Sequence, residues 1–145
     1  MSKTEVKPLP KILYIEDNAD ARLLVGRLMV GRYVMIEAQE PMIGIQLAEE
    51  TQPDLILLDI NLPHMNGIDV AVRLRSILKP GTPILALTAG FIPEIRERAL
   101  AAGFSGFMSK PIDIGIFYEQ IDAFLESKHK ESPDVTSPCA PAGRS

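Results

Sequence analysis

The sequence of 145 residues contains only one cysteine, Cys139. A single cysteine cannot form a disulfide within the chain, so a disulfide-stabilised fold is excluded and a reducing compartment is expected. No apolar run approaches the roughly 18 residues of a membrane span, and the first ten residues contain no apolar signal-peptide core. We therefore predict a cytoplasmic protein with no membrane partner.

The chain also lacks an excess of basic residues. It has 15 Lys and Arg against 19 Asp and Glu, a net charge of −4. Because a DNA-binding domain needs a basic face to neutralise phosphates, direct DNA binding is not expected. The length and the hydrophobic fraction of 46% are typical of one globular domain.

Five short apolar runs alternate with segments of helical periodicity, which predicts βα units around a parallel sheet. The fold class is α/β, a doubly wound five-stranded parallel sheet of flavodoxin-like order 2-1-3-4-5 with five helices. The predicted strands are residues 11–15, 33–37, 55–58, 84–87 and 106–108.

Capping residues and helix breakers bound the five predicted helices. The first follows the N-cap Asn18, and the second covers residues 41–50. Both are expected to turn apolar side chains toward the sheet. The first should present Leu23, Leu24 and Leu28, with Val25 as a further candidate, and the second should present Ile43, Leu47 and Ala48.

The third helix follows Gly67 and buries either Ala71 or Val72, and the fourth begins at Pro93. The fifth is capped by Asp113 and is expected to end near residue 127. Residues 128–145 are rich in proline and polar side chains, so we predict a disordered tail there. The expected domain boundaries are 1–9 for a flexible amino terminus and 10–127 for the folded domain.

Polar residues follow four of the predicted strands where each strand ends. Glu16 and Asp17 follow the first, Asp59 the third, Thr88 the fourth and Lys110 the fifth. Because the carboxyl ends of parallel strands meet at one edge, the order 2-1-3-4-5 makes these groups neighbours.

Carboxylates about 5 Å apart repel by roughly 3 kcal/mol at an effective dielectric constant near 20. Such a cluster needs a cation, and Mg²⁺ suits a few carboxylates, waters and a phosphate oxygen. The backbone carbonyl of Asn61, two residues beyond Asp59, is placed to add a ligand. With Lys110 nearby, a carboxylate could then attack a phosphoryl group.

The sequence at these positions resembles the receiver domain of two-component response regulators. The similar segments are YIEDN, LLDINLPHMNG, ALTAG and GFMSKP, and the likeness extends over residues 11–125. The family roles that the resemblance implies are a phospho-acceptor at Asp59, Mg²⁺ ligands at Glu16, Asp17, Asp59 and the Asn61 carbonyl, and phosphoryl-binding groups at Thr88 and Lys110. It also implies a rotamer-switching aromatic at Phe107, turn residues at Pro63 and Gly67, and a cis bond before Pro111.

The resemblance implies a signalling switch in a two-component phosphorelay, not a conventional enzyme, although it assists its own phosphorylation and dephosphorylation. The expected donor is a histidine kinase or a histidine phosphotransfer protein. The output is expected to pass by protein contact to an unknown downstream partner, through the fourth helix, fifth strand and fifth helix. No output domain follows the fifth helix, so a stand-alone receiver is expected, with a phosphate sink or a piece of a hybrid kinase as alternatives.

Three other classes compete with this interpretation. A haloacid-dehalogenase-like phosphatase needs a second acid two positions after its nucleophile, where this chain has Asn61. A flavodoxin-like cofactor binder is disfavoured because Asp17 and Asp20 would repel a phosphate. A pseudo-receiver would keep the fold without phosphorylation.

The chain departs from the family pattern in two places. Glu16 stands where Asp is commonest, and its longer side chain favours contact with the metal through water over direct ligation. The loop of residues 89–93 is unusually apolar.

Overall fold

The computed structural model describes residues 8–60, 66–89 and 93–130. Strands and helices alternate along the chain. The strands are β1 Lys11–Ile15, β2 Val34–Ala38, β3 Leu55–Asp59, β4 Ile84–Thr88 and β5 Gly106–Ser109. The helices are α1 Ala19–Met29, α2 Pro41–Thr51, α3 Gly67–Ile77, α4 Pro93–Ala102 and α5 Ile114–Lys130. Every predicted strand lies within one residue of its observed bounds.

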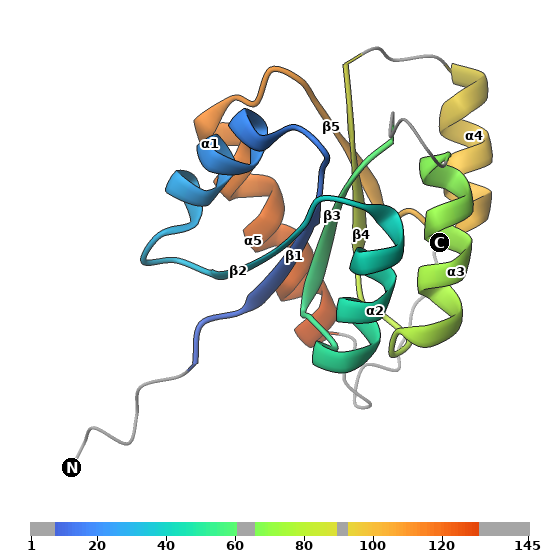
Figure 1. Cartoon of the computed structure of the whole chain (residues 1–145), viewed down its shortest axis with the longest axis horizontal. Helices are drawn as coiled ribbons and strands as arrows, with labels where there is room; N and C mark the ends of the chain where they lie inside the picture. Colours follow the sequence, from blue (N-terminus) through green and yellow to red (C-terminus); the bar gives the residue numbers. More distant parts are fainter. Residues whose placement is uncertain (1–7, 61–65, 90–92, 131–145) are drawn as a thin grey trace.

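The five strands form one parallel sheet in the order β2-β1-β3-β4-β5 (Figure 1). This confirms the predicted fold class and strand order. The order reverses between β1 and β3, so the loops that leave these two neighbours turn to opposite faces of the sheet. The carboxyl ends of β1 and β3 therefore flank the position where ligands bind in folds of this type.

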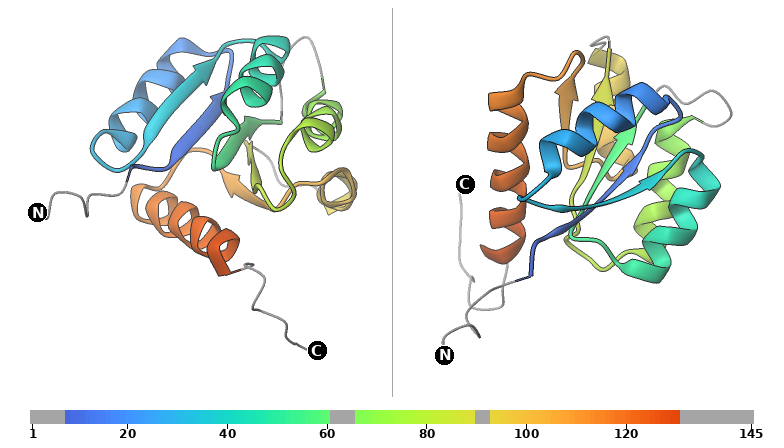
Figure 2. Two further views of the ribbon diagram at one scale, coloured as in Figure 1. Left: turned by 90° about the horizontal axis from the view of Figure 1, so that it is seen from below. Right: turned by 60° about the vertical axis from the view of Figure 1, so that its left-hand side comes forward.

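Helices cover both faces of the sheet (Figure 2). One core cluster packs α1 and α5 against the sheet through Val25, Leu28 and Phe117. The other packs α2, α3 and α4 against the opposite face through residues such as Ala48, Leu74 and Ala99. Every residue of β3 and β4 is buried, as expected of strands covered on both sides.

The face that α1 turns to the sheet differs in part from the prediction, which is confirmed for Leu28 and Val25 but wrong for Leu23 and Leu24. Leu23 and Leu24 are 58% and 52% exposed, whereas Val25, Leu28 and Met29 are buried. The buried residues are three and four positions apart and form one stripe. Leu23 precedes Val25 by two residues, which places it about 200° around the helix from that stripe.

Similar corrections apply to α2 and α5. Helix α2 meets the sheet through Gly44 and Ala48, and Ile43 is partly exposed to solvent. The helix approaches the sheet so closely at Gly44 that a Cβ there would lie only 2.5 Å from Ile15 Cδ1. Helix α5 continues to Lys130, beyond the predicted end of the folded domain at residue 127. No proline or glycine interrupts residues 127–130, so nothing in the sequence stops the helix there.

Other sequence-based expectations are confirmed. Asn18 caps α1 by accepting a hydrogen bond from the backbone N–H of Ala21, and Asp113 caps α5 through Ile116 N. In α3, Ala71 is buried and Val72 exposed, which resolves that alternative. The helices among the described residues are too short or too polar to span a bilayer. The expectations for residues 1–7 and 131–145, including Cys139, lie outside the described residues.

Gly67 begins α3 immediately beside the end of β3. A Cβ at this position would lie 2.7 Å from Ile60 Cα and 3.0 Å from Ile60 O, both backbone atoms that cannot move aside easily. The side chain of Asn66 caps the helix by accepting from Ile68 N at 2.7 Å. Close packing of Gly67 thus fixes where α3 starts relative to the residue after Asp59.

We predict that Gly67→Ala lowers the free energy of unfolding by about 1–3 kcal/mol, because the added methyl group forces the backbone apart. Gly26→Ala is the matched control, since its Cβ would meet Met35 Sδ at an ordinary 3.5 Å. That change removes a helix-interior glycine and should be neutral or stabilising by up to about 1 kcal/mol. Urea unfolding of both variants tests this, and equal losses would contradict the account.

Candidate functional site

Four strand ends bring their polar residues to one edge of the sheet. Asp59 and Thr88 are the last residues of β3 and β4, Glu16 and Asp17 directly follow β1, and Lys110 directly follows β5. Backbone hydrogen bonds continue past the strands and fix these ends relative to one another. Lys110 N donates to Thr88 O at 2.9 Å, and Ile60 N donates to Leu87 O at 3.0 Å.

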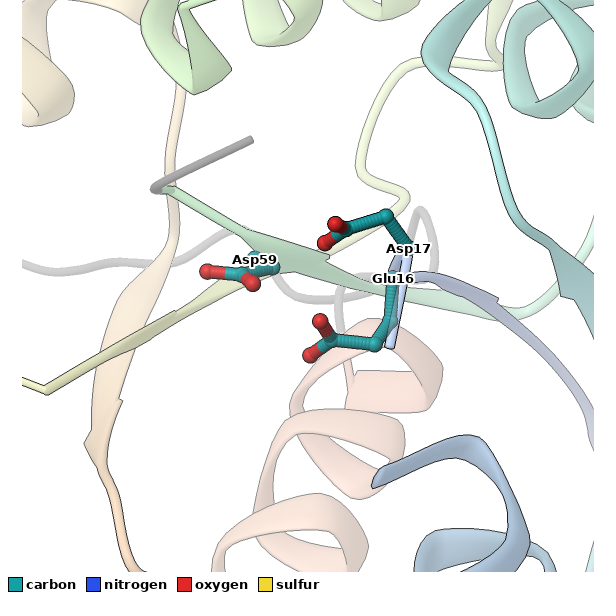
Figure 3. A group of neighbouring side chains, drawn as sticks. All are labelled: Glu16, Asp17 and Asp59. Atoms are coloured by element: carbon teal, nitrogen blue, oxygen red, sulfur yellow. The ribbon is translucent and has the colours of Figure 1, made fainter. Parts of the chain in front are cut away.

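Three carboxylates converge at this edge. One oxygen from each of Glu16, Asp17 and Asp59 lies within 4.8 Å of the others. Figure 3 shows the carboxylates of Glu16 and Asp17 extending from the end of β1 toward Asp59. The exposed fractions of Glu16 and Asp59 are 1% and 4%, while Asp17 is exposed to solvent. Two of the three charges are thus withdrawn from water.

Lys110 supplies positive charge to the two buried acids. Its Nζ lies 3.1 Å from Glu16 Oε1 and 3.2 Å from Asp59 Oδ2. The side chain reaches the edge of the sheet from β5, past the end of β4. One ammonium group cannot balance three carboxylates, so these four residues together keep a net negative charge.

The pKa values of Glu16 and Lys110 are both shifted by their neighbours in the cluster. Burial, followed by the closeness of Asp59, raises the pKa of Glu16 above its ordinary value, and Lys110 only partly opposes this. Burial acts to lower the pKa of Lys110, but the hydrogen bond to Glu16 and the charge of Asp59 outweigh it and raise that pKa. Both shifts indicate crowded negative charge.

Glu16 has further hydrogen-bond partners that sequence reasoning missed. The hydroxyl of Tyr14 donates to Glu16 Oε1 at 3.0 Å, and the backbone N–H of Asn18 donates to Oε2 at 3.3 Å. Burial and the neighbouring Glu16 raise the pKa of Tyr14. Tyr14 precedes Glu16 by two residues, and side chains two apart along a strand share a face. That spacing was a signal for the contact.

The donor set fits a hard divalent cation. Carboxylate oxygens from two adjacent strand ends are the ligands that Mg²⁺ prefers, and the three negative charges gathered here favour a cation at this position. Asn61, whose carbonyl was predicted to be a fourth ligand, lies outside the described residues, as does Pro63.

The remaining predicted residues lie around the cluster. Thr88 is buried at the end of β4, with an exposed fraction of 9%. Phe107 is half-buried and packs on the face that α2, α3 and α4 cover. Its ring centroid lies 6.1 Å from that of Phe104 and 5.6 Å from the Arg96 guanidinium carbon. The bond between Lys110 and Pro111 is cis, as the resemblance implied.

Known proteins and a protein family share sequence with most of this chain. The family described as the response regulator receiver domain matches residues 12–122. The chain is 32% identical over 120 residues to the polar-differentiation response regulator DivK of Brucella anthropi, covering 81% of this chain and 98% of DivK. It is also 32% identical over 121 residues to the autoinducer 2 sensor kinase/phosphatase LuxQ of Vibrio harveyi. That match covers 83% of this chain but only 14% of LuxQ.

A solved structure shares the fold of this chain. The chemotaxis protein CheY4 of Vibrio cholerae has a TM-score of 0.75 and 27% sequence identity to this chain. The superposition covers 80% of this chain and 98% of CheY4. The shared fold therefore extends over nearly the whole of that protein.

The crowding of Glu16 and Asp59 predicts a pH-dependent effect of Asp59→Asn in the absence of divalent ions. Because folding raises the pKa of Glu16, the native site contributes its full stability below the ordinary glutamate pKa. That contribution is lost as the pH rises through the raised value. Asp59→Asn removes one of the two buried negative charges and leaves Lys110 paired with Glu16.

We expect the variant to exceed the native chain in free energy of unfolding by about 1 kcal/mol or more near pH 7. The difference should shrink toward about pH 4, where protonation already relieves the repulsion. Urea unfolding in EDTA at a series of pH values measures it. A less stable variant, or a difference independent of pH, would count against the account.

Proposed function

The chain belongs to the response regulator receiver domain family, and on that premise we propose that it is a switch that accepts a phosphoryl group on the Asp59 carboxylate. One observation carries the proposal. Oxygens of Glu16, Asp17 and Asp59 lie within 4.8 Å of one another, and Lys110 Nζ contacts both buried acids. The Asp59 carboxylate, the proposed nucleophile, thus lies beside the Lys110 ammonium group and beside oxygen ligands suited to a divalent cation.

The proposed donor is a phosphohistidine of a histidine kinase or histidine phosphotransfer protein. An Asp59 carboxylate oxygen attacks the phosphorus, the phosphorus–nitrogen bond breaks, and the donor imidazole leaves with the electron pair and takes up a proton. The likeness to part of LuxQ, a sensor kinase/phosphatase, supports a donor of this class.

Glu16, Asp17 and Asp59 would hold Mg²⁺, which when bound supplies positive charge to the phosphoryl oxygens. Lys110 already lies 3.2 Å from Asp59 Oδ2 and is placed to pair with a phosphoryl oxygen in the product. Asp17, the exposed member of the cluster, keeps one side of the site open to a donor. The residues of the chain thus orient the nucleophile and stabilise the charge of the transferred group.

The phosphorylated state is proposed to reorganise the end of β4. A change from about 1% to 99% of an active conformation needs about 5.5 kcal/mol of differential stabilisation. A hydrogen bond from the Thr88 hydroxyl to a charged phosphoryl group supplies roughly 1.5–3 kcal/mol, so contacts of Lys110 and the cation must add the rest. Phe107, packed beside Phe104 and Arg96, is the proposed second switch residue. Helix α4, strand β5 and helix α5 are the proposed output surface.

A signalling module accounts for the site better than a phosphatase. Receiver domains signal through protein contacts and are not conventional enzymes. Position 61 is Asn, where the haloacid-dehalogenase-like mechanism needs an acid. Loss of the phosphoryl group from Asp59 would then be self-dephosphorylation of the switch, and a phosphate-sink role would use the same site.

The first test is phosphorylation itself. After incubation with acetyl phosphate and MgCl2, we expect the intact native chain to gain the mass of one phosphoryl group. Asp59→Asn should gain none, because an amide is not nucleophilic toward phosphorus. Glu97→Gln, an exposed carboxylate on α4, is the control and should react as the native chain does. Equal labelling of Asp59→Asn and the native chain would refute the assignment.

The second test is the response to metal. Because Mg²⁺ binds only the folded site, saturating MgCl2 should raise the free energy of unfolding, by about 2.7 kcal/mol at a hundredfold excess over Kd. The gain should be largely lost in Asp59→Asn and retained in Glu97→Gln. Thermal unfolding with and without MgCl2 measures it, and equal gains in all three chains would contradict the ligand assignment.

A further inference from the structure

Tyr14 is a buried core residue that reaches the carboxylate cluster. Its exposed fraction is 0%, and its ring packs in the cluster formed with α1 and α5. Its hydroxyl donates to Glu16 Oε1 at 3.0 Å. Because Tyr14 and Glu16 are two residues apart and lie on one face of the chain, the hydroxyl lies directly beneath the cluster.

Glu16 receives hydrogen bonds on both carboxylate oxygens. Oε1 accepts from Tyr14 and from Lys110 Nζ at 3.1 Å, and Oε2 accepts from Asn18 N at 3.3 Å. A glutamate has one more rotatable bond than an aspartate, so its carboxylate needs more contacts to be held in one place. Of these donors, Lys110 also contacts Asp59 and Asn18 bonds through its backbone. Tyr14 contributes a second side-chain donor to Glu16, from a residue buried in the core.

We propose that Tyr14 is a positioning residue for the metal and phosphoryl site, which acts by fixing the carboxylate of Glu16. This inference rests on the proposed function of that site. Partners that hydrogen-bond metal-ligating carboxylates orient them, and their removal typically weakens metal binding about tenfold or more. Tyr14 and Glu16 then form one unit, in which the hydroxyl compensates for the longer acid.

A simpler role for Tyr14 is that of a core ring whose hydroxyl bonds to the nearest acceptor. The chain offers a matched example in Tyr33. This tyrosine is buried in the same cluster, and its hydroxyl donates to Asp122 Oδ1 at 2.6 Å, on α5 and away from the carboxylate cluster. Both tyrosines join a buried ring to a carboxylate. Only the Tyr14 partner belongs to the proposed site.

The test is a calorimetric titration with MgCl2 of the native chain, Tyr14→Phe and Tyr33→Phe. Phenylalanine keeps the buried ring, so both variants should fold, which urea unfolding checks. Tyr14→Phe should raise the Kd for Mg²⁺ about tenfold. Tyr33→Phe should leave Kd within about twofold of the native value, although it loses a comparable hydrogen bond. Equal values of Kd for the native chain and Tyr14→Phe would overturn the proposal.

A double-mutant cycle with Glu16→Asp tests whether Tyr14 acts through Glu16. The shorter acid withdraws its carboxylate from the Tyr14 hydroxyl, so adding Tyr14→Phe to Glu16→Asp should change Kd by less than about twofold. The same tenfold loss in both backgrounds would mean that Tyr14 acts through packing, and would overturn the proposal. Failure of the proposed function gives a different result, because the native chain would then neither bind Mg²⁺ nor gain a phosphoryl group.

Discussion

Two buried carboxylates, those of Glu16 and Asp59, repel each other at the carboxyl edge of the sheet, and the proposed function depends on their being held close together. Each would be more stable in water or further from the other. Parallel pairing of β1 with β3 fixes their separation, since neither strand end can move without breaking the ladder. Lys110 reduces the repulsion but also contacts both acids at once, so it holds them together.

The rest of the fold supplies the rigidity that this arrangement needs. Strands β3 and β4 are buried on both faces, and their apolar side chains anchor the strand ends at which Asp59 and Thr88 lie. The close contact of Gly67 with the backbone of Ile60 fixes the start of α3 beside the end of β3, where Asp59 lies. The energy of a large apolar core thus maintains a small polar site that is unfavourable by itself.

Much of the fold and site could be predicted from the sequence, because strand ends carry their own signal. Continuous apolar runs predicted the strands, and the polar residues that follow four of these runs predicted the members of the cluster. Side-chain orientation was harder. Leu23 and Ile43 were expected to be buried, but the buried stripe of α1 excludes Leu23, and α2 approaches Ile15 through Gly44. Hydrophobicity identifies an apolar helix, whereas the face it buries depends on how closely the backbone approaches the sheet. The hydrogen bond from Tyr14 to Glu16 was missed because a tyrosine in an apolar run has the pattern of an ordinary core residue.

The central claim is that crowded acids trap a divalent cation beside a reactive carboxylate. Mn²⁺ accepts the same oxygen ligands as Mg²⁺ and scatters anomalously, so a crystal structure of the chain grown with MnCl2 locates the cation directly. The account predicts an anomalous peak in contact with carboxylate oxygens of Asp17 and Asp59, with Glu16 in contact directly or through water. A well-ordered edge of the sheet with no such peak, or a peak bound only elsewhere on the molecule, would contradict it.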